Sequence, residues 1–151
     1  MIESENIALD DLLSFSQRQE KQGVPIFLVG HSLGGALSIM MAATEPEQFK
    51  GVSLIAPLIE YYEPERIQKF IPIARILNKI MPTFKFGIPH PNKPKHSLHF
   101  FNDELCQSEK ICAHNVMLSD RILKNLHDVY IPKFKSPLLT IECGFDRIVS
   151  N

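Results

Sequence analysis

The sequence has 151 residues, of which 44% are apolar and 22% are charged, and its formal net charge is −1. These proportions are typical of one soluble globular domain, and the interspersed charges argue against nucleic acid as a partner. No apolar run approaches the roughly 20 residues that a membrane-spanning helix needs, and the polar start of the chain lacks the features of a signal peptide. We therefore expect a single domain over residues 1–151 and, by default, a location in the cytoplasm.

The first part of the chain predicts a strand between two helices. Apolar residues recur at helical spacing over residues 7–21. The short apolar run Ile26–Val29 shows no alternation, which suits a strand buried on both faces of a parallel sheet. After the glycine-rich turn Gly30–Gly35, residues 36–44 predict a second helix.

The rest of the chain predicts two further strands of the same sheet. Residues 51–57 form the second apolar run, and Leu138–Ile141 forms the third, after a predicted helix over residues 118–126. A strand, a crossover helix and a second strand make a right-handed βαβ unit by default. The pattern therefore predicts the α/β class with a parallel sheet.

A long insertion, approximately residues 58–115, separates the second strand from the third. Within it, residues 65–81 predict a basic amphipathic helix, which Pro72 should kink. Residues 84–99 are rich in Pro, Lys and His and predict irregular structure.

The strongest chemical signal is Gly30-x-Ser32-x-Gly34, which lies between the first predicted strand and the next helix. A serine hydroxyl needs a base to become a nucleophile, and a sharp strand-to-helix turn exposes it to a substrate carbonyl. We therefore expect Ser32 to be a catalytic nucleophile. The alternative is a glycine-rich turn with an incidental serine. A phosphate-binding P-loop is excluded, because no Lys-Ser or Lys-Thr pair follows the glycines.

The neighbours of Ser32 complete the predicted nucleophile elbow. His31 and Gly35 belong to the turn, where small residues let the chain pass close to its surroundings. The main-chain N–H of Leu33 lies at the start of the following helix. We expect it to donate to the oxyanion that forms when Ser32 attacks.

Asp146 is the second chemical signal, because it lies just past the carboxyl end of the third predicted strand. Functional groups gather at that edge of a parallel sheet, and the acid follows the serine in the order that α/β-hydrolases use. We expect Asp146 to orient a histidine. The alternative is a surface aspartate in a turn.

Several segments together resemble the monoglyceride lipases and their lysophospholipase-like relatives among the serine aminopeptidase S33-like hydrolases. They are Phe27–Ala36, Val52–Leu58, the cap-like motif Phe101–Cys106, and Pro137–Ile141 with Gly144–Arg147. The resemblance runs from about Asp10 to Val149, nearly the whole chain. The spacing between the segments fits as well, which makes the match more specific than the Ser32 pentapeptide alone.

The resemblance implies an α/β-hydrolase fold with a cap inserted at residues 58–115, the nucleophile at Ser32, an oxyanion donor at Leu33 and the triad acid at Asp146. It implies a lipid ester with one acyl chain as substrate, monoacylglycerol above all, and neither a metal nor an organic cofactor. Family caps carry an amphipathic helix that lies on membranes, and residues 65–81 match it. The location would then be cytoplasmic or peripheral to a membrane. The alternative is a cap helix that packs on the rest of the protein.

Two parts of the family pattern have no match. Only Arg147–Asn151 follow Asp146, without a histidine, and nothing upstream of Ser32 matches the family's His-Gly loop. We therefore expect a fragment that is inactive alone and that aggregates or stays partly unfolded, because its sheet would have unpaired edges.

The histidines of the chain are His31, His90, His96, His99, His114 and His127. We expect none of them to replace the missing base. One lies in the turn beside Ser32, four lie in the insertion, and His127 follows a predicted helix at the surface. His96 and His99 with Cys106, Cys112 and His114 fit no standard zinc spacing. With Cys143 the cysteines number three, which argues against a disulfide framework.

Two other functions stay open. One is a truncated, non-catalytic α/β-hydrolase-like protein that binds a lipid or a partner. The other is a peptidase, thioesterase or haloperoxidase on the same fold.

Overall fold

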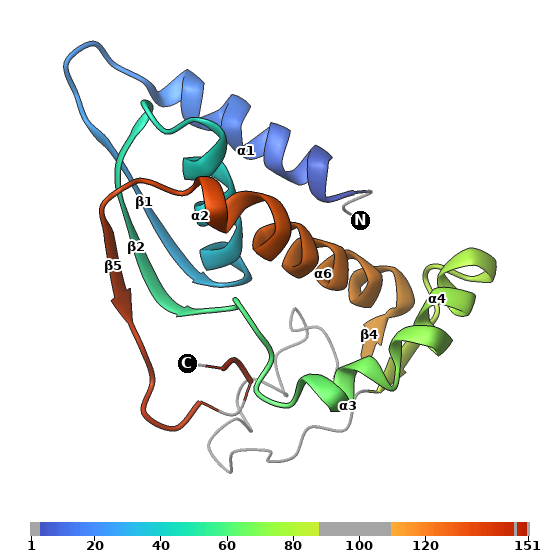
Figure 1. The fold of residues 1–151 in the computed structure, drawn as a ribbon. Coiled ribbons are helices and arrows are strands. Elements are labelled where there is room, and N and C mark those ends of the chain that lie inside the picture. Colours follow the sequence, from blue (N-terminus) through green and yellow to red (C-terminus); the bar gives the residue numbers. More distant parts are fainter. Residues whose placement is uncertain (1–3, 88–109, 147, 151) are drawn as a thin grey trace, which may run out of the picture. The chain divides into compact units, whose positions relative to one another are not determined.

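The computed structural model describes residues 4–87, 110–146 and 148–150. Contacts divide the chain into two units, which we describe separately with the element labels of Figure 1. The core unit comprises Met1–Gln68 and Leu118–Asn151, and the inserted unit comprises Lys69–Met117.

The core unit begins with a helix, a strand, a helix and a strand. These are α1 (Glu5–Gln19), β1 (Ile26–Ser32), α2 (Leu33–Thr44) and β2 (Phe49–Pro57). α1 starts two residues before its predicted bound, because the Ser4 side chain caps it by accepting the Ile7 N–H at 3.3 Å. α2 follows β1 directly. The residues of the predicted turn Gly30–Gly35 are therefore divided between the end of the strand and the start of the helix.

The second part of the core unit returns to the sheet. The short α3 (Pro64–Gln68) follows β2. The helix α6 (Ala113–Asn125) begins in the inserted unit and belongs to the core unit from Leu118 on. It continues into a π-helical turn (Leu126–Tyr130) and a 3-10 turn (Ile131–Lys133) before β5 (Leu138–Ile141). The helix predicted over residues 118–126 is thus the second half of a longer helix.

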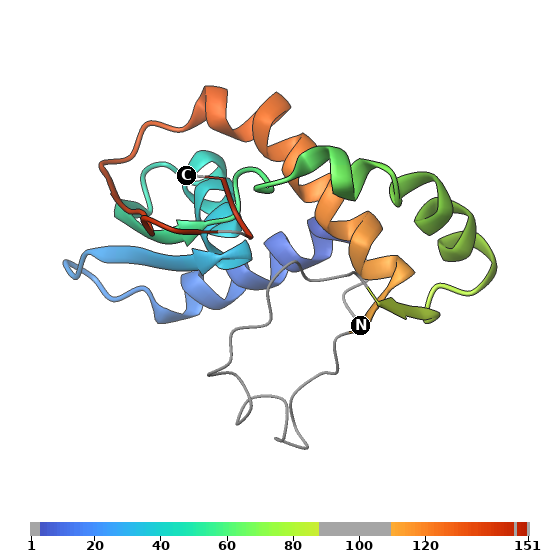
Figure 2. The ribbon, with the colours of Figure 1, turned by 90° about the horizontal axis from the view of Figure 1, so that it is seen from below.

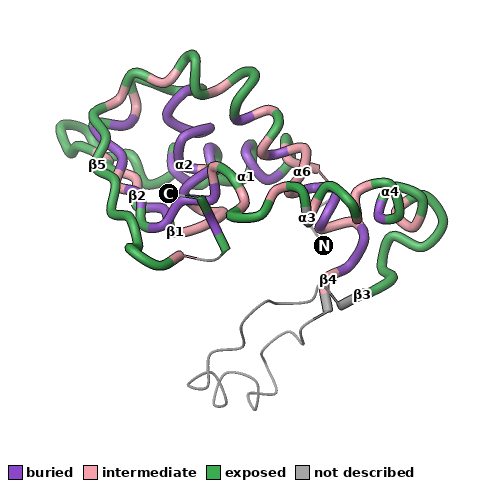
Figure 3. Tube along the Cα trace, turned by 60° about the horizontal axis from the view of Figure 1, so that its bottom comes forward, coloured by how far each residue is buried: buried purple, intermediate pink, exposed green. Residues whose placement is uncertain are grey.

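The three strands of the core unit form a parallel sheet in the order β1-β2-β5, which confirms the predicted class (Figure 2). α2 is the crossover between β1 and β2 and packs on both strands, and α1 packs on α2. Figure 3 shows most of α2 as buried. The main core cluster consists of Leu9, Leu13, Ala36, Ile39, Met40, Met41, Ala42, Phe49, Val52, Leu54, Leu118, Ile122 and Leu126.

The opposite face of this sheet is exposed in the described part of the core unit. Phe27 and Val29 are 62% and 71% exposed, and all four residues of β5 are exposed. A groove of about 330 Å³ runs over this face between β1, β2 and β5. The prediction that β1 is buried on both faces is therefore wrong for the described residues. The physical reason is that α1, α2 and α6 supply the same core cluster and leave the other face without a packed helix.

The inserted unit contains α4 (Ile71–Ile80), β3 (Lys85–Gly87) and β4 (Lys110–Cys112), and the two strands pair antiparallel. Ala74, Val116 and Met117 form its buried cluster. Of the stretch predicted to be irregular, residues 85–87 form β3, and residues 88–99 lie outside the described residues.

The single kinked helix predicted over residues 65–81 is corrected to two separate helices, α3 and α4. Pro72 lies in the first turn of α4. Proline lacks an N–H and clashes with the carbonyl four residues earlier, so it starts a helix more readily than it continues one. Among the described residues, no helix is both long and apolar enough to cross a membrane.

Candidate active site

The backbone of Ser32 is held in an unfavourable conformation. Its φ is 51° and its ψ is −122°, although it is neither glycine nor asparagine. Such a conformation costs about 1–3 kcal/mol and persists only where the surrounding structure imposes it. Ser32 is the last residue of β1 and occupies the N-cap position of α2 without a capping hydrogen bond from its side chain, so the strand-to-helix turn predicted for a nucleophile is present.

The chain is closely packed around Gly30 and Gly35 on either side of this turn. A Cβ atom on Gly30 would lie 2.6 Å from the Ser38 hydroxyl oxygen, and one on Gly35 would lie 2.7 Å from the Pro57 Cβ. Neither position can hold a larger residue without a shift of its neighbours. A Cβ on Gly34 would meet nothing within 4 Å, so space does not explain that third glycine.

Leu33 is the first residue of α2, and its N–H is one of the four that a helix leaves without an intrahelical acceptor. The positive end of the helix dipole lies at the same place. His31 is exposed on β1 and pairs in register with Ile55. Gly30, His31 and Leu33 adjoin Ser32 in the chain, and their role in a nucleophile elbow stays a prediction.

Asp146 follows β5 after the short segment Glu142–Phe145 and is half-buried. Its Oδ1 accepts the N–H groups of Ile148 at 2.8 Å and of Val149 at 3.0 Å. No described residue donates to its Oδ2. One carboxylate oxygen therefore holds the turn, and the other can accept from a further group.

The turn of Asp146 is connected to the elbow of Ser32 through the end of β2. Val149 is 2% exposed and packs with Ala56 and Leu58, and Leu33 packs against the same cluster. No pattern in the sequence signals this cluster, because its members are far apart in the chain. The one unusual feature among them is Ala56, whose φ of 41° would favour glycine.

The described histidines are not placed as the partner of Asp146. In the core unit, His31 is exposed, and His127 donates from Nε2 to the carbonyl oxygen of Ile59 at 3.0 Å. In the inserted unit, Nδ1 of His114 donates to Oδ1 of Asn78 at 3.3 Å. His90, His96 and His99 lie outside the described residues.

The structure offers no metal-binding cluster within its described ranges, where no three His, Cys, Asp or Glu side chains gather. Cys112 is buried and Cys143 is exposed. Cys106, His96 and His99 are outside these ranges, so the expected absence of a metal stays a prediction.

Comparison with known proteins gives a family match over the whole chain. The family model described as serine aminopeptidase, S33 matches residues 1–151. Human monoglyceride lipase is 28% identical over 139 residues, which cover 88% of this chain and 45% of that protein. Mouse monoglyceride lipase is 30% identical over 131 residues, which cover 83% of this chain and 42% of that protein. The chain thus spans less than half the length of these two relatives.

Solved structures show the same fold. The monoacylglycerol lipase of Paleococcus ferrophilus matches with a TM-score of 0.70 at 21% identity, covering 92% of this chain and 54% of that one. A soluble variant of the Saccharomyces cerevisiae monoglyceride lipase matches with a TM-score of 0.72 at 20% identity, covering 97% and 54%. The chain therefore belongs to the serine aminopeptidase S33 family and has an α/β-hydrolase fold.

Proposed function

We propose that the complete protein carrying this sequence hydrolyses carboxylic esters of lipids, most of all monoacylglycerols, through an acyl-enzyme on Ser32. The observation that supports this most is the strained backbone of Ser32, at φ 51°, where β1 ends and α2 begins. Strain of this kind is retained where it presents a reactive group. The substrate class rests on the relatives, which are monoglyceride lipases.

The proposed reaction has two steps. Ser32 Oγ attacks the ester carbonyl carbon while a histidine of the complete protein that is not among the residues of this sequence accepts its proton, and the Leu33 N–H donates to the oxyanion. Asp146 accepts a hydrogen bond from the protonated imidazole through Oδ2. The histidine then returns the proton to the departing alcohol oxygen, which leaves Ser32 acylated. Water attacks the acyl group with the help of the same base and releases the fatty acid.

The decisive experiment replaces Ser32 by Ala in the complete protein. Turnover of a monoacylglycerol should fall by a factor on the order of 10⁶, because the nucleophile is lost. The matched control is Ser53→Ala, which removes a half-buried hydroxyl from the middle of β2 and should retain activity. Equal turnover by the two variants would contradict the proposed function. A panel of acyl esters and aminoacyl substrates would separate lipase from peptidase chemistry.

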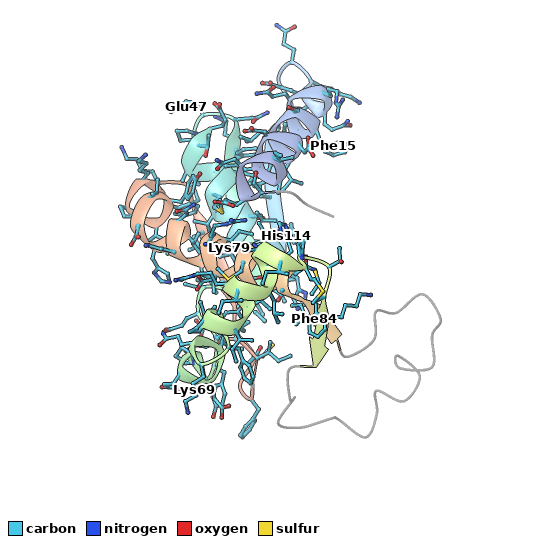
Figure 4. All side chains as sticks on the ribbon, turned by 90° about the vertical axis from the view of Figure 1, so that its right-hand side faces the viewer. Phe15, Glu47, Lys69, Lys79, Phe84 and His114 are labelled. Atoms are coloured by element: carbon cyan, nitrogen blue, oxygen red, sulfur yellow. The ribbon has the colours of Figure 1, made fainter. Side chains whose placement is uncertain are left out.

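We also propose that α4, within the cap insertion of residues 58–115, contacts a lipid surface. Ile73, Ile76 and Ile80 are 57%, 60% and 71% exposed and recur at helical spacing. Figure 4 shows Lys69 and Lys79 near opposite ends of this helix, where they can meet anionic headgroups. An exposed apolar stripe with flanking cations is typical of a helix that lies in a membrane interface.

Sedimentation with vesicles of phosphatidylcholine and phosphatidylserine tests this contact. Replacing both Ile76 and Ile80 by Ser should lower vesicle binding about tenfold or more, because each buried isoleucine contributes about 1.5–3 kcal/mol. The control Ile131→Ser changes an isoleucine of the core unit that is 38% exposed. If the double variant and the control bind vesicles equally, α4 packs on protein instead.

A further inference from the structure

We propose that the segment Glu60–Tyr62, which we call the strap, is a positioning element that holds Asp146 in register with Ser32. This inference rests on the proposed function, because it assigns the strap a role in the same reaction. The strap begins after Leu58 and Ile59, the two residues that follow β2. Its residues belong to neither of the two motifs that carry the chemistry.

The strap is bound to the turn of Asp146 by main-chain hydrogen bonds. Tyr61 and Val149 form an isolated antiparallel bridge. On one side of this bridge Tyr62 N–H donates to Ile148 O at 3.1 Å, and on the other side Ser150 N–H donates to Glu60 O at 2.9 Å. Residues 148–150 are therefore held by the strap on one side and by the Asp146 carboxylate on the other.

The side chain of Tyr61 attaches the strap to the body of the core unit. Its ring packs against the cluster of Ala56, Leu58 and Val149, and its hydroxyl hydrogen-bonds the side chain of Ser119 on α6. Burial raises the pKa of the Tyr61 phenol, and the hydrogen bond to Ser119 partly opposes that increase. The phenol is thus an anchored neutral group at neutral pH.

The same stretch of chain also contacts the elbow. The N–H of Leu58, just before the strap, donates to Ser32 O at 2.8 Å. One continuous segment therefore contacts the nucleophile at its beginning and the acid turn at its end. A catalytic group displaced by about 1 Å can lose about 10²-fold in rate, so this connection has a catalytic consequence beyond stability.

The test uses the complete protein with Ser150→Pro, which removes the N–H that donates to Glu60. Residue 149 before a proline is restricted to extended backbone, which its antiparallel bridge already requires. Ser150→Ala is the matched reference, because it keeps the N–H and removes only an exposed hydroxyl. Rates are expressed per mole of Ser32 that reacts with a fluorophosphonate, so that unfolded protein does not count.

The expected result is a fall in kcat of about 10- to 100-fold relative to Ser150→Ala, with KM changed by less than about twofold. The acid limb of the kcat/KM profile should also move to lower pH. A displaced Asp146 stabilises the protonated histidine less, and the pKa of that imidazole therefore falls. If the strap only stabilised the fold, Ser150→Pro would lower the amount of reactive Ser32 and leave the acid limb of the kcat/KM profile where it is.

A second variant, Tyr61→Phe, keeps the ring and removes the hydrogen bond to Ser119. It should shift the acid limb in the same direction by a smaller amount, and it decides the question if Ser150→Pro does not fold. The inference is overturned if the folded variants match Ser150→Ala in kcat and in pH profile while Ser32→Ala is inactive. If Ser32→Ala is fully active, the proposed function itself fails first.

Discussion

The main-chain N–H of Leu58 donates a hydrogen bond to the carbonyl oxygen of Ser32 at 2.8 Å. This bond joins the residue just after β2 to the last residue of β1, where the register of the two strands shifts between His31 and Ser32. Both sides of the junction contain a non-glycine residue at positive φ, namely Ser32 and Ala56. The elbow is therefore a tertiary structure held by two strands, and its stability can be tested at each contact.

Gly35→Ala should destabilise the complete protein, because the new Cβ would lie 2.7 Å from Pro57 Cβ and 3.0 Å from Pro57 Cα. Overpacking of this kind costs about 1–3 kcal/mol. Gly34→Ala is the matched control, since its Cβ meets nothing within 4 Å and alanine favours the helix. Urea unfolding should show a lower midpoint for the first variant and an equal or higher midpoint for the second. Equal midpoints would contradict the close approach of α2 to β2.

Two valines on opposite faces of the sheet should respond differently to lysine in the isolated 151-residue chain. Val29 is 71% exposed beside the groove, whereas Val52 is 4% exposed in the core cluster. Val29→Lys should reduce self-association and binding of an apolar dye, because it interrupts an exposed apolar face. Val52→Lys should unfold the chain, since an unpaired buried charge costs several kcal/mol. Sedimentation velocity and circular dichroism measure both effects, and unchanged self-association of Val29→Lys would contradict the open face.

The stability of the core unit should decrease above about pH 10, and Tyr61→Phe should reduce that decrease. Burial first, and then Asp120, raise the pKa of Tyr61 from its ordinary value of 10.0, against the Ser119 hydrogen bond. Between the unfolded and folded pKa values the unfolded chain binds fewer protons, so the free energy of unfolding falls as pH rises. The contribution of the Tyr61 phenol to the free energy of unfolding is fully present below pH 10 and is lost as pH rises through the pKa of the folded state.

Tyr130 contributes with the same sign, because burial and then Glu5 and Asp10 raise its pKa. Urea unfolding of the complete protein at several values of pH between 8 and 11 checks both tyrosines. An identical alkaline decrease in Tyr61→Phe and the unaltered protein would show that the phenol of Tyr61 does not titrate with unfolding.

The isolated 151-residue chain should hydrolyse monoacylglycerol no faster than the same chain with Ser32→Ala. Neither His31 nor His127 hydrogen-bonds Asp146, and loss of the base costs a factor on the order of 10⁶ in turnover. The measurement is fatty-acid release by both chains at equal concentration. A rate that depends on Ser32 would show that a histidine of this chain serves as the base.

The amino-acid sequence by itself was sufficient for the local features of this protein. Apolar runs predicted all three strands of the parallel sheet, since a short apolar run bounded by turn residues favours a strand whatever packs on it later. Gly30-x-Ser32-x-Gly34 predicted a strand-to-helix turn, because the sterics of that turn act between neighbours in the chain. The sequence also predicted that Asp146 follows the strand Leu138–Ile141, because that strand is recognisable from its own apolar run.

Only the tertiary structure decided which surfaces and segments meet. The pattern of Ile26–Val29 predicted burial on both faces, but burial depends on how many helices pack on a sheet, and the described residues cover one face. Pro72 predicted a kink, whereas the chain forms two helices. The packing of Leu58 with Val149 and the bridge from Tyr61 to Val149 had no local signal. Such contacts join residues that are distant in sequence, and their energy depends on the folded chain as a whole.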